Sequence, residues 1–128
     1  MKNKILVVDD DPEVILSAEL YLKQHINTVI TAEKPTNIIP IILENNVDVV
    51  LLDMNYSKGK NDGEEGLTWL QSLKTEVPQV EIVLMTAYAE VNLAVKSIRY
   101  GASDFVTKPW QNEKLLADTL AFFVCAWR

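Results

Sequence analysis

The sequence predicts an α/β domain built around a doubly wound, five-stranded parallel sheet. Two textures alternate along the 128 residues: short β-branched runs, and longer stretches in which apolar residues recur three and four positions apart. Five strands that alternate with five helices indicate β-α units with a parallel sheet. We expect one domain over residues 1–128, because this length suits a single domain and 48% hydrophobic residues are enough for a core.

The five expected strands are short and rich in β-branched residues: Ile5–Val8, Thr28–Thr31, Val47–Leu52, Val80–Met85 and Phe105–Thr107. The third of them is almost continuously apolar, as a central strand covered on both faces should be. We expect these strands to take the spatial order 2-1-3-4-5 of flavodoxin-like folds.

Capping residues and prolines place the helices. Asp11 is a good N-cap, and Pro12 suits the first helical position that follows it. Pro40 is tolerated in the second helix only within about the first turn. Gly101 stands where the fourth helix should stop. The fifth helix is expected over about residues 110–127, where the chain could lead into a further domain.

Composition excludes several classes of protein. Twelve Lys and Arg against eighteen Asp and Glu give a net charge of −6, which argues against direct binding of nucleic acid. A single cysteine, Cys125, cannot form an internal disulfide and indicates a reducing, cytoplasmic setting. The apolar run after the basic N-terminus is too short for a signal peptide, and no stretch approaches the ~20 residues of a membrane helix.

Polar and charged residues that could take part in binding or catalysis lie where the expected strands end. These residues are Asp9 and Asp10 after the first strand, Asp53 after the third, Thr86 after the fourth and Lys108 after the fifth. Ligands of doubly wound sheets bind beyond the carboxyl ends of the strands. In the order 2-1-3-4-5 these four strands are neighbours, so three carboxylates, a hydroxyl and an ammonium should meet at one edge.

Three neighbouring carboxylates repel one another unless a cation lies between them. Hard oxygen ligands that leave room for water and phosphate suit Mg²⁺. An ammonium beside the metal would neutralise a phosphoryl group, and a hydroxyl could donate a hydrogen bond to it. Since neither Ser nor Cys lies among these strand ends, a carboxylate must be the nucleophile or acceptor. The edge is therefore predicted to be a phosphoryl-transfer site.

Four segments in this order resemble the receiver domain of bacterial two-component response regulators: Ile5–Asp11, Leu51–Asn55, Met85–Tyr88 and Lys108–Trp110. The resemblance spans roughly residues 3–124. The Met-Thr-Ala-Tyr and Lys-Pro-Trp variants are most similar to receivers attached to sigma-54-dependent transcriptional activators. Such a domain is a phospho-accepting switch and not an enzyme, and it would regulate transcription through an effector domain outside this chain.

The resemblance assigns roles around the metal and the acceptor. Asp53 resembles the residue that takes a phosphoryl group from a histidine kinase or phosphotransfer protein. Asp10 resembles the direct Mg²⁺ ligand, Asp9 a ligand acting mainly through water, and Asn55 a ligand through its backbone carbonyl. Lys108 resembles the invariant lysine of the family.

The resemblance also assigns the switch. Thr86 resembles the hydroxyl that moves toward the phosphoryl group, and Phe105 the aromatic side chain that changes rotamer with it. In receivers, the fourth helix, fifth strand and fifth helix commonly form a dimer surface. The expected fifth helix has two apolar stripes, which make a wider face than a one-sided cover needs. We therefore expect a phosphorylation-dependent homodimer. The stripes are Leu116, Leu120, Phe123 and Trp127, and Leu115, Phe122 and Ala126.

One segment departs from the family pattern. No proline follows the acceptor in Met54-Asn55-Tyr56-Ser57. If Gly66-Leu67 matches the Gly-Leu pair of the family, residues 55–66 form a polar loop with three glycines and several additional residues. This insertion borders the site, where it bears on the lifetime of an acyl phosphate.

Two other classes of protein fit the sequence less well. A Mg²⁺-dependent phosphatase or phosphotransferase would carry a proton-donating aspartate two residues after its nucleophile, a position that holds Asn55. A flavodoxin-like binding module would need a Ser/Thr-rich phosphate loop after the first strand, where this chain has three aspartates.

Overall fold

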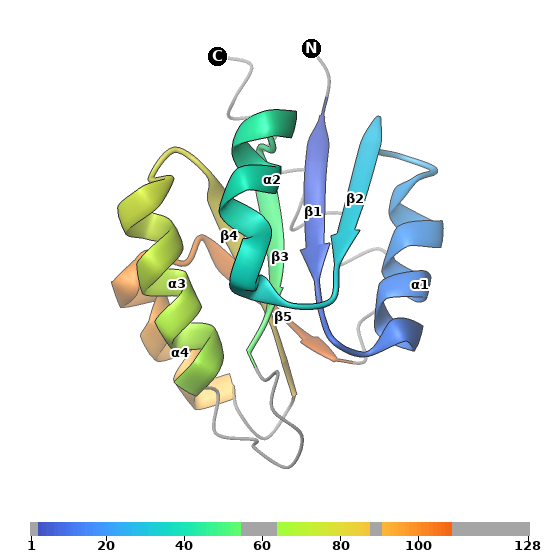
Figure 1. Cartoon of the computed structure of the whole chain (residues 1–128). Helices are drawn as coiled ribbons and strands as arrows, with labels where there is room; N and C mark the ends of the chain where they lie inside the picture. The colour runs from blue at the N-terminus through green and yellow to red at the C-terminus, as the bar shows by residue number, and fades with distance from the viewer. Residues whose placement is uncertain (1–2, 55–63, 88–90, 109–128) are drawn as a thin grey trace.

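The computed structural model describes residues 3–54, 64–87 and 91–108 of the chain. The described part holds one parallel sheet in the order β2-β1-β3-β4-β5 (Figure 1). Its strands are β1 (Lys4–Val8), β2 (Thr28–Ala32), β3 (Val49–Asp53), β4 (Glu81–Ala87) and β5 (Asp104–Lys108). The predicted fold class and strand order are confirmed. The third strand begins at Val49 and not at Val47, whose N–H instead bonds back to the carbonyl of Ile42.

Four helices connect the strands in the described residues. They are α1 (Pro12–Leu22), α2 (Ile38–Asn45), α3 (Glu64–Glu76) and α4 (Val91–Ser97), with short 3₁₀ turns η1 (Pro35–Asn37) before α2 and η3 (Ile98–Tyr100) after α4. The expected fifth helix, with its two apolar stripes, lies outside the described residues.

The capping predictions are confirmed. The side chain of Asp11 accepts the N–H of Glu13 at 2.9 Å and so caps α1. Pro40 is the third residue of α2, where its missing N–H costs no helical hydrogen bond. Gly101 follows η3 with a φ of 109°, a backbone conformation that favours glycine.

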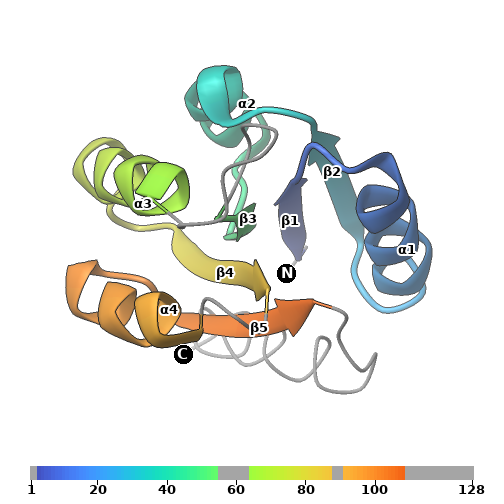
Figure 2. The same ribbon diagram turned by 90° about the horizontal axis from the view of Figure 1, so that it is seen from below.

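Helices cover both faces of the sheet, with α1 on one face and α2, α3 and α4 on the other (Figure 2). Successive side chains of a strand point to opposite faces. In β1, for example, Ile5 and Val7 pack with α1, whereas Leu6 and Val8 pack with the other helices. The same alternation decides on which face a side chain at the end of a strand lies.

In the part of the chain that the structure describes, no helix is both long and apolar enough to cross a membrane.

Candidate functional site

The strand register aligns the residues at the carboxyl edge of the sheet. Val8, which precedes Asp9, pairs with Leu52, and Asp53 pairs with Met85. Lys108 pairs with Ala87 at the ends of β4 and β5. The alternation of side chains then gives Asp9, Asp53 and Lys108 the same side of the sheet as α1, because each continues the series of residues that pack on that helix.

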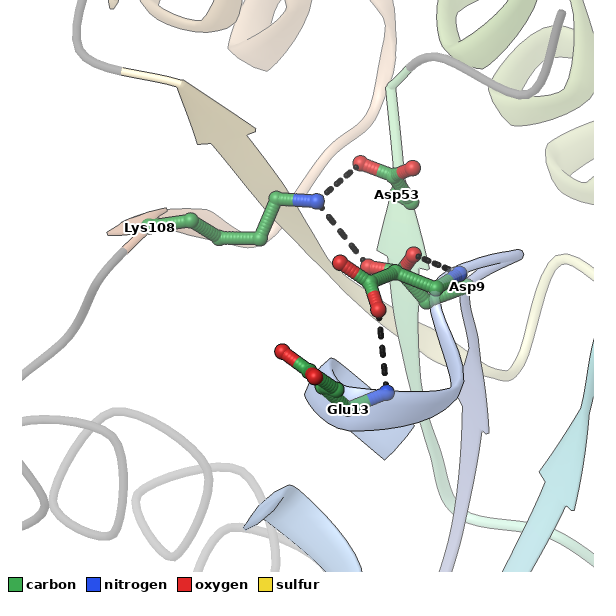
Figure 3. A network of polar contacts seen from close by, with 5 residues as sticks. Asp9, Glu13, Asp53 and Lys108 are labelled. Carbon is green, nitrogen blue, oxygen red and sulfur yellow. Dashed lines mark hydrogen bonds and ion pairs between the residues drawn. The ribbon is translucent and has the colours of Figure 1, made fainter. Parts of the chain in front are cut away.

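Lys108 bridges the two buried carboxylates across 99 and 55 residues of sequence (Figure 3). Its Nζ lies 3.0 Å from Oδ2 of Asp9 and 2.9 Å from Oδ1 of Asp53. The side chains of Asp9 and Asp53 are 0% and 5% exposed, and that of Lys108 is 22% exposed. Charged groups this deep are stable only when paired, and Lys108 pairs with both.

The start of α1 fixes the position of Asp9. Oδ1 of Asp9 accepts the backbone N–H of Asp11 at 2.9 Å, and Asp11 in turn accepts the N–H of Glu13 (Figure 3). Both carboxylate oxygens of Asp9 are therefore hydrogen-bonded, one to the backbone and one to Lys108. Asp10, in contrast, is exposed at the turn between β1 and α1.

Burial and charge act against each other on the ionisation of this site. Burial raises the pKa of Asp9 above its ordinary value, although the hydrogen bond from Asp11 and the charge of Lys108 act in the opposite direction. For Lys108, burial alone would lower the pKa, but the hydrogen bonds and charges of Asp53 and Asp9 together raise it. The protonated, charged form of Lys108 is therefore favoured, whereas the ionised form of Asp9 is disfavoured.

The donor set fits a divalent cation. Asp9, Asp10 and Asp53 each offer a carboxylate oxygen, and these oxygens lie within 4.8 Å of one another. Among the described residues of the site, three carboxylates against one ammonium leave a surplus of two negative charges, which a divalent cation would neutralise. An all-oxygen set with one exposed member also suits Mg²⁺, which keeps several of its waters. Asn55, the fourth predicted ligand, lies outside the described residues.

The two predicted switch residues lie on the opposite face of the sheet. Thr86 is wholly buried in β4, directly after Met85, which pairs with Asp53. Phe105 of β5 pairs with Leu84 and is half-buried against the core beneath α2, α3 and α4. The structure thus brings Asp9, Asp10, Asp53 and Lys108 into one cluster and puts Thr86 beside it in the neighbouring strand.

The sequence did not predict how the chain is held just after Asp53. Met54 is fully buried, its N–H donates to the carbonyl of Met85 at 3.1 Å, and its carbonyl accepts the N–H of Gly66 at 2.9 Å. The only sequence signal for this contact was the Gly66-Leu67 pair after the polar loop.

This fold, with an acidic, lysine-bridged site at the carboxyl edge of its sheet, defines the class of signalling receiver domains. The family model of the response regulator receiver domain matches residues 5–119. The chain therefore belongs to the response regulator receiver family of two-component systems, as its four motifs predicted.

Similar proteins include transcriptional regulators and a solved receiver. The transcriptional regulatory protein MalR of Bacillus subtilis (strain 168) is 32% identical over 112 residues, which are 86% of this chain and 46% of MalR. The regulatory protein AtoC of Escherichia coli (strain K12) is 36% identical over 115 residues, 88% of this chain and 23% of AtoC. The N-terminal signal receiver domain of a two-component response regulator from Bacteroides fragilis is 43% identical with a TM-score of 0.85, and the match covers 94% of this chain and 96% of that one.

The chain thus spans less than half the length of these two curated relatives. Sigma-54-dependent activators, the group that its motifs resemble, are among the regulators to which it is similar.

Proposed function

We propose that this domain accepts a phosphoryl group on Asp53, from a histidine kinase or phosphotransfer protein, in a Mg²⁺-dependent reaction that switches a partner surface. The observation that carries the proposal is the position of Lys108, within hydrogen-bond distance of both Asp53 and Asp9. Phosphoryl transfer depends mainly on positioning and charge neutralisation, and this cluster supplies both.

In the proposed step, one carboxylate oxygen of Asp53 forms a bond to phosphorus. The bond from phosphorus to the nitrogen or oxygen of the donor breaks, and the donor keeps that electron pair. Lys108 neutralises charge on the phosphoryl oxygens while remaining beside Asp9. Mg²⁺, held by Asp9, Asp10 and Asp53 with the backbone carbonyl of Asn55, would neutralise the rest of the charge.

The alternative of an enzyme that hydrolyses or passes on the phosphoryl group is less favoured. Such an enzyme would use an acid two residues after its nucleophile, and that residue is Asn55. We therefore propose a switch with at most self-phosphorylation and self-dephosphorylation, which acts in the cytoplasm with its kinase.

The signal would pass from the site to the surface through Thr86 and Phe105. Movement of the buried Thr86 hydroxyl toward a phosphoryl group on Asp53 would free space on the α4 side of the sheet, where Phe105 is half-buried. Next to it, α4 and η3 expose apolar side chains of Val95, Ile98 and Tyr100. We propose that α4, β5 and the final helix form a phosphorylation-dependent homodimer and relay the signal to an effector domain that regulates transcription.

The phosphorylation proposal is tested by intact-mass spectrometry with a small phosphodonor and Mg²⁺. The wild type should gain one phosphoryl group, and Asp53→Asn should gain none. Asp48→Asn, a change of the same kind at the opposite edge of the sheet, should label like the wild type. Equal labelling of Asp53→Asn would refute the assignment.

The switch proposal is tested with Thr86→Ala, which should accept phosphate and yet respond poorly because the sensing hydroxyl is gone. Thr107, the partner of Thr86 in β5, provides the matched control Thr107→Ala. NMR shifts of α4 and β5 on activation should be lost only in Thr86→Ala. Sedimentation should show the activated wild type self-associating and Val95→Glu remaining monomeric; a wild type that is monomeric in every condition would refute the dimer.

A further inference from the structure

Gly66 lies against the backbone of the residue that follows the proposed phospho-acceptor. A Cβ atom added at Gly66 would lie 2.4 Å from Cα of Met54 and 3.0 Å from its Cβ and its carbonyl oxygen. Separations under 3.0 Å are essentially never seen for a Cβ atom. Since the closest atom belongs to the backbone, no rotamer change of Met54 can relieve the overlap.

The peptide of Met54 is held from two sides. On one side its N–H donates to Met85, the residue before Thr86, and on the other its carbonyl accepts the N–H of Gly66. Met54 is fully buried and packs in the core with Leu70 and Leu73 of α3. Because Met54 is covalently bonded to Asp53, a displacement of Met54 would also move Asp53 away from Lys108.

We infer that Gly66 is a positioning residue for phosphoryl transfer: its missing side chain lets the first turn of α3 close on Met54 and fix the carboxylate of Asp53 against Lys108. This inference rests on the proposed function of Asp53. The role does not require Gly66 to touch the phosphoryl group. It requires only that the backbone after the acceptor has one position, because a misplacement of about 1 Å can cost about 100-fold in rate.

The test compares Gly66→Ala with Gly101→Ala. Gly101 is also intolerant of a side chain, since its φ is 109° and its added Cβ would lie 2.9 Å from Cγ of Lys74. That overlap involves a flexible side chain. Gly101 also lies away from the proposed site, because the nearby Ser103 donates its N–H to the carbonyl of Ile82 near the start of β4. Both variants should be less stable, so each phosphorylation rate is normalised to the folded fraction measured by circular dichroism.

With a small phosphodonor and Mg²⁺ both saturating, Gly66→Ala should be phosphorylated at least about 10-fold more slowly than the wild type, whereas Gly101→Ala should stay within about 2-fold. Once it is normalised to the folded fraction, a rate at saturation reports the geometry of the reacting groups. Gly66→Ala at the wild-type rate, or an equal loss in the two variants, would overturn the positioning role while the proposed function stands. A wild type that takes no phosphoryl group would overturn both.

If Gly66→Ala does not fold, amide hydrogen exchange of the wild type provides the test. The N–H of Gly66 should be protected as strongly as that of Met54, because the two hydrogen bonds hold the same residue, Met54, from its two sides. Free exchange at Gly66 would show that α3 does not hold the acceptor strand and would overturn the inference.

Discussion

The two edges of the sheet use charged side chains in different ways. At the amino edge, three of them hydrogen-bond to backbone groups or to a neutral hydroxyl. Asp48 accepts the N–H of Lys4 at 3.1 Å, Glu81 accepts the hydroxyl of Ser103, and Lys74 donates to the carbonyls that precede β4. At the carboxyl edge, the described residues place three carboxylates together, and the ammonium of Lys108 pairs with two of them.

This difference separates a structural edge from a functional one. Hydrogen bonds at the amino edge close β1, β4 and β5 at their starts, and each of these three charges has neutral hydrogen-bond partners. The surplus of negative charge at the carboxyl edge disfavours the folded domain until a cation reduces it, so it marks the edge where ligands should act. Substitutions at the two edges should therefore change the free energy of unfolding differently, in sign, in dependence on ligands and in dependence on pH.

The largest difference between the edges is expected for their lysines. Lys108→Ala leaves two buried carboxylates without their shared cation and should lower the free energy of unfolding by about 1–3 kcal/mol without Mg²⁺. Lys74→Ala, at the amino edge, removes bonds to two backbone carbonyls without leaving a buried charge unpaired, and should cost less than about 1 kcal/mol. Urea denaturation measures both, and an equal loss would remove the distinction between the edges.

The second difference concerns metal binding. Asp10→Asn removes an exposed charged oxygen from the acidic cluster and should weaken Mg²⁺ binding at least about 10-fold. Even the loss of a group that only supports a metal ligand typically lowers metal affinity by about that factor. Asp48→Asn, the amino-edge control, should leave the affinity unchanged. Isothermal titration gives both values. An unchanged affinity in Asp10→Asn would move the metal away from this cluster.

A smaller effect is expected at the amino edge itself. Ser103→Ala removes a hydroxyl that accepts the N–H of Ile82 at 3.1 Å and contacts Glu81. The free energy of unfolding should fall by about 1 kcal/mol, whereas the phosphorylation rate should not change. A change in that rate would mean that the edges are coupled through β4 and β5.

One substitution at the carboxyl edge should raise the free energy of unfolding, whereas the lysine and serine substitutions above lower it. Burial raises the pKa of Asp9 above its ordinary value of 3.8, so its ionised form disfavours folding. This cost is absent well below pH 3.8, where the group is protonated in both states, and is complete above the raised pKa. Without Mg²⁺, Asp9→Asn should therefore raise the urea midpoint at neutral pH, and its advantage should shrink as the pH falls. An advantage that grows on acidification would contradict this account.

The sequence was sufficient for the strand order and for the four residues that the structure brings together at the carboxyl edge. Strand periodicity predicted the sheet, and the rule that ligands gather beyond strand ends put Asp9, Asp53 and Lys108 together. Within the run of aspartates, capping predicted the role of Asp11. The sequence could not show that Asp9 is wholly buried while Asp10 is exposed, since burial beyond the end of a strand depends on what packs over it.

The contact between Gly66 and Met54 was also beyond the sequence. It depends on how closely α3 packs on the end of β3, a distance set by the side chains of the core and not by periodicity or capping. Helix packing brings two backbones together only at a residue without a Cβ, which is why one glycine after a polar loop has a structural consequence.

We propose that Asp53, and not one of the two aspartates beside it, receives the phosphoryl group. The direct measurement is chemical trapping in the wild-type protein: phosphorylation with Mg²⁺, reduction of the acyl phosphate by borohydride to homoserine, and peptide mass spectrometry. Homoserine is expected at position 53 alone, and none is expected when Mg²⁺ is removed. Homoserine at position 9 or 10, or trapping at position 53 that does not depend on Mg²⁺, would contradict the proposal.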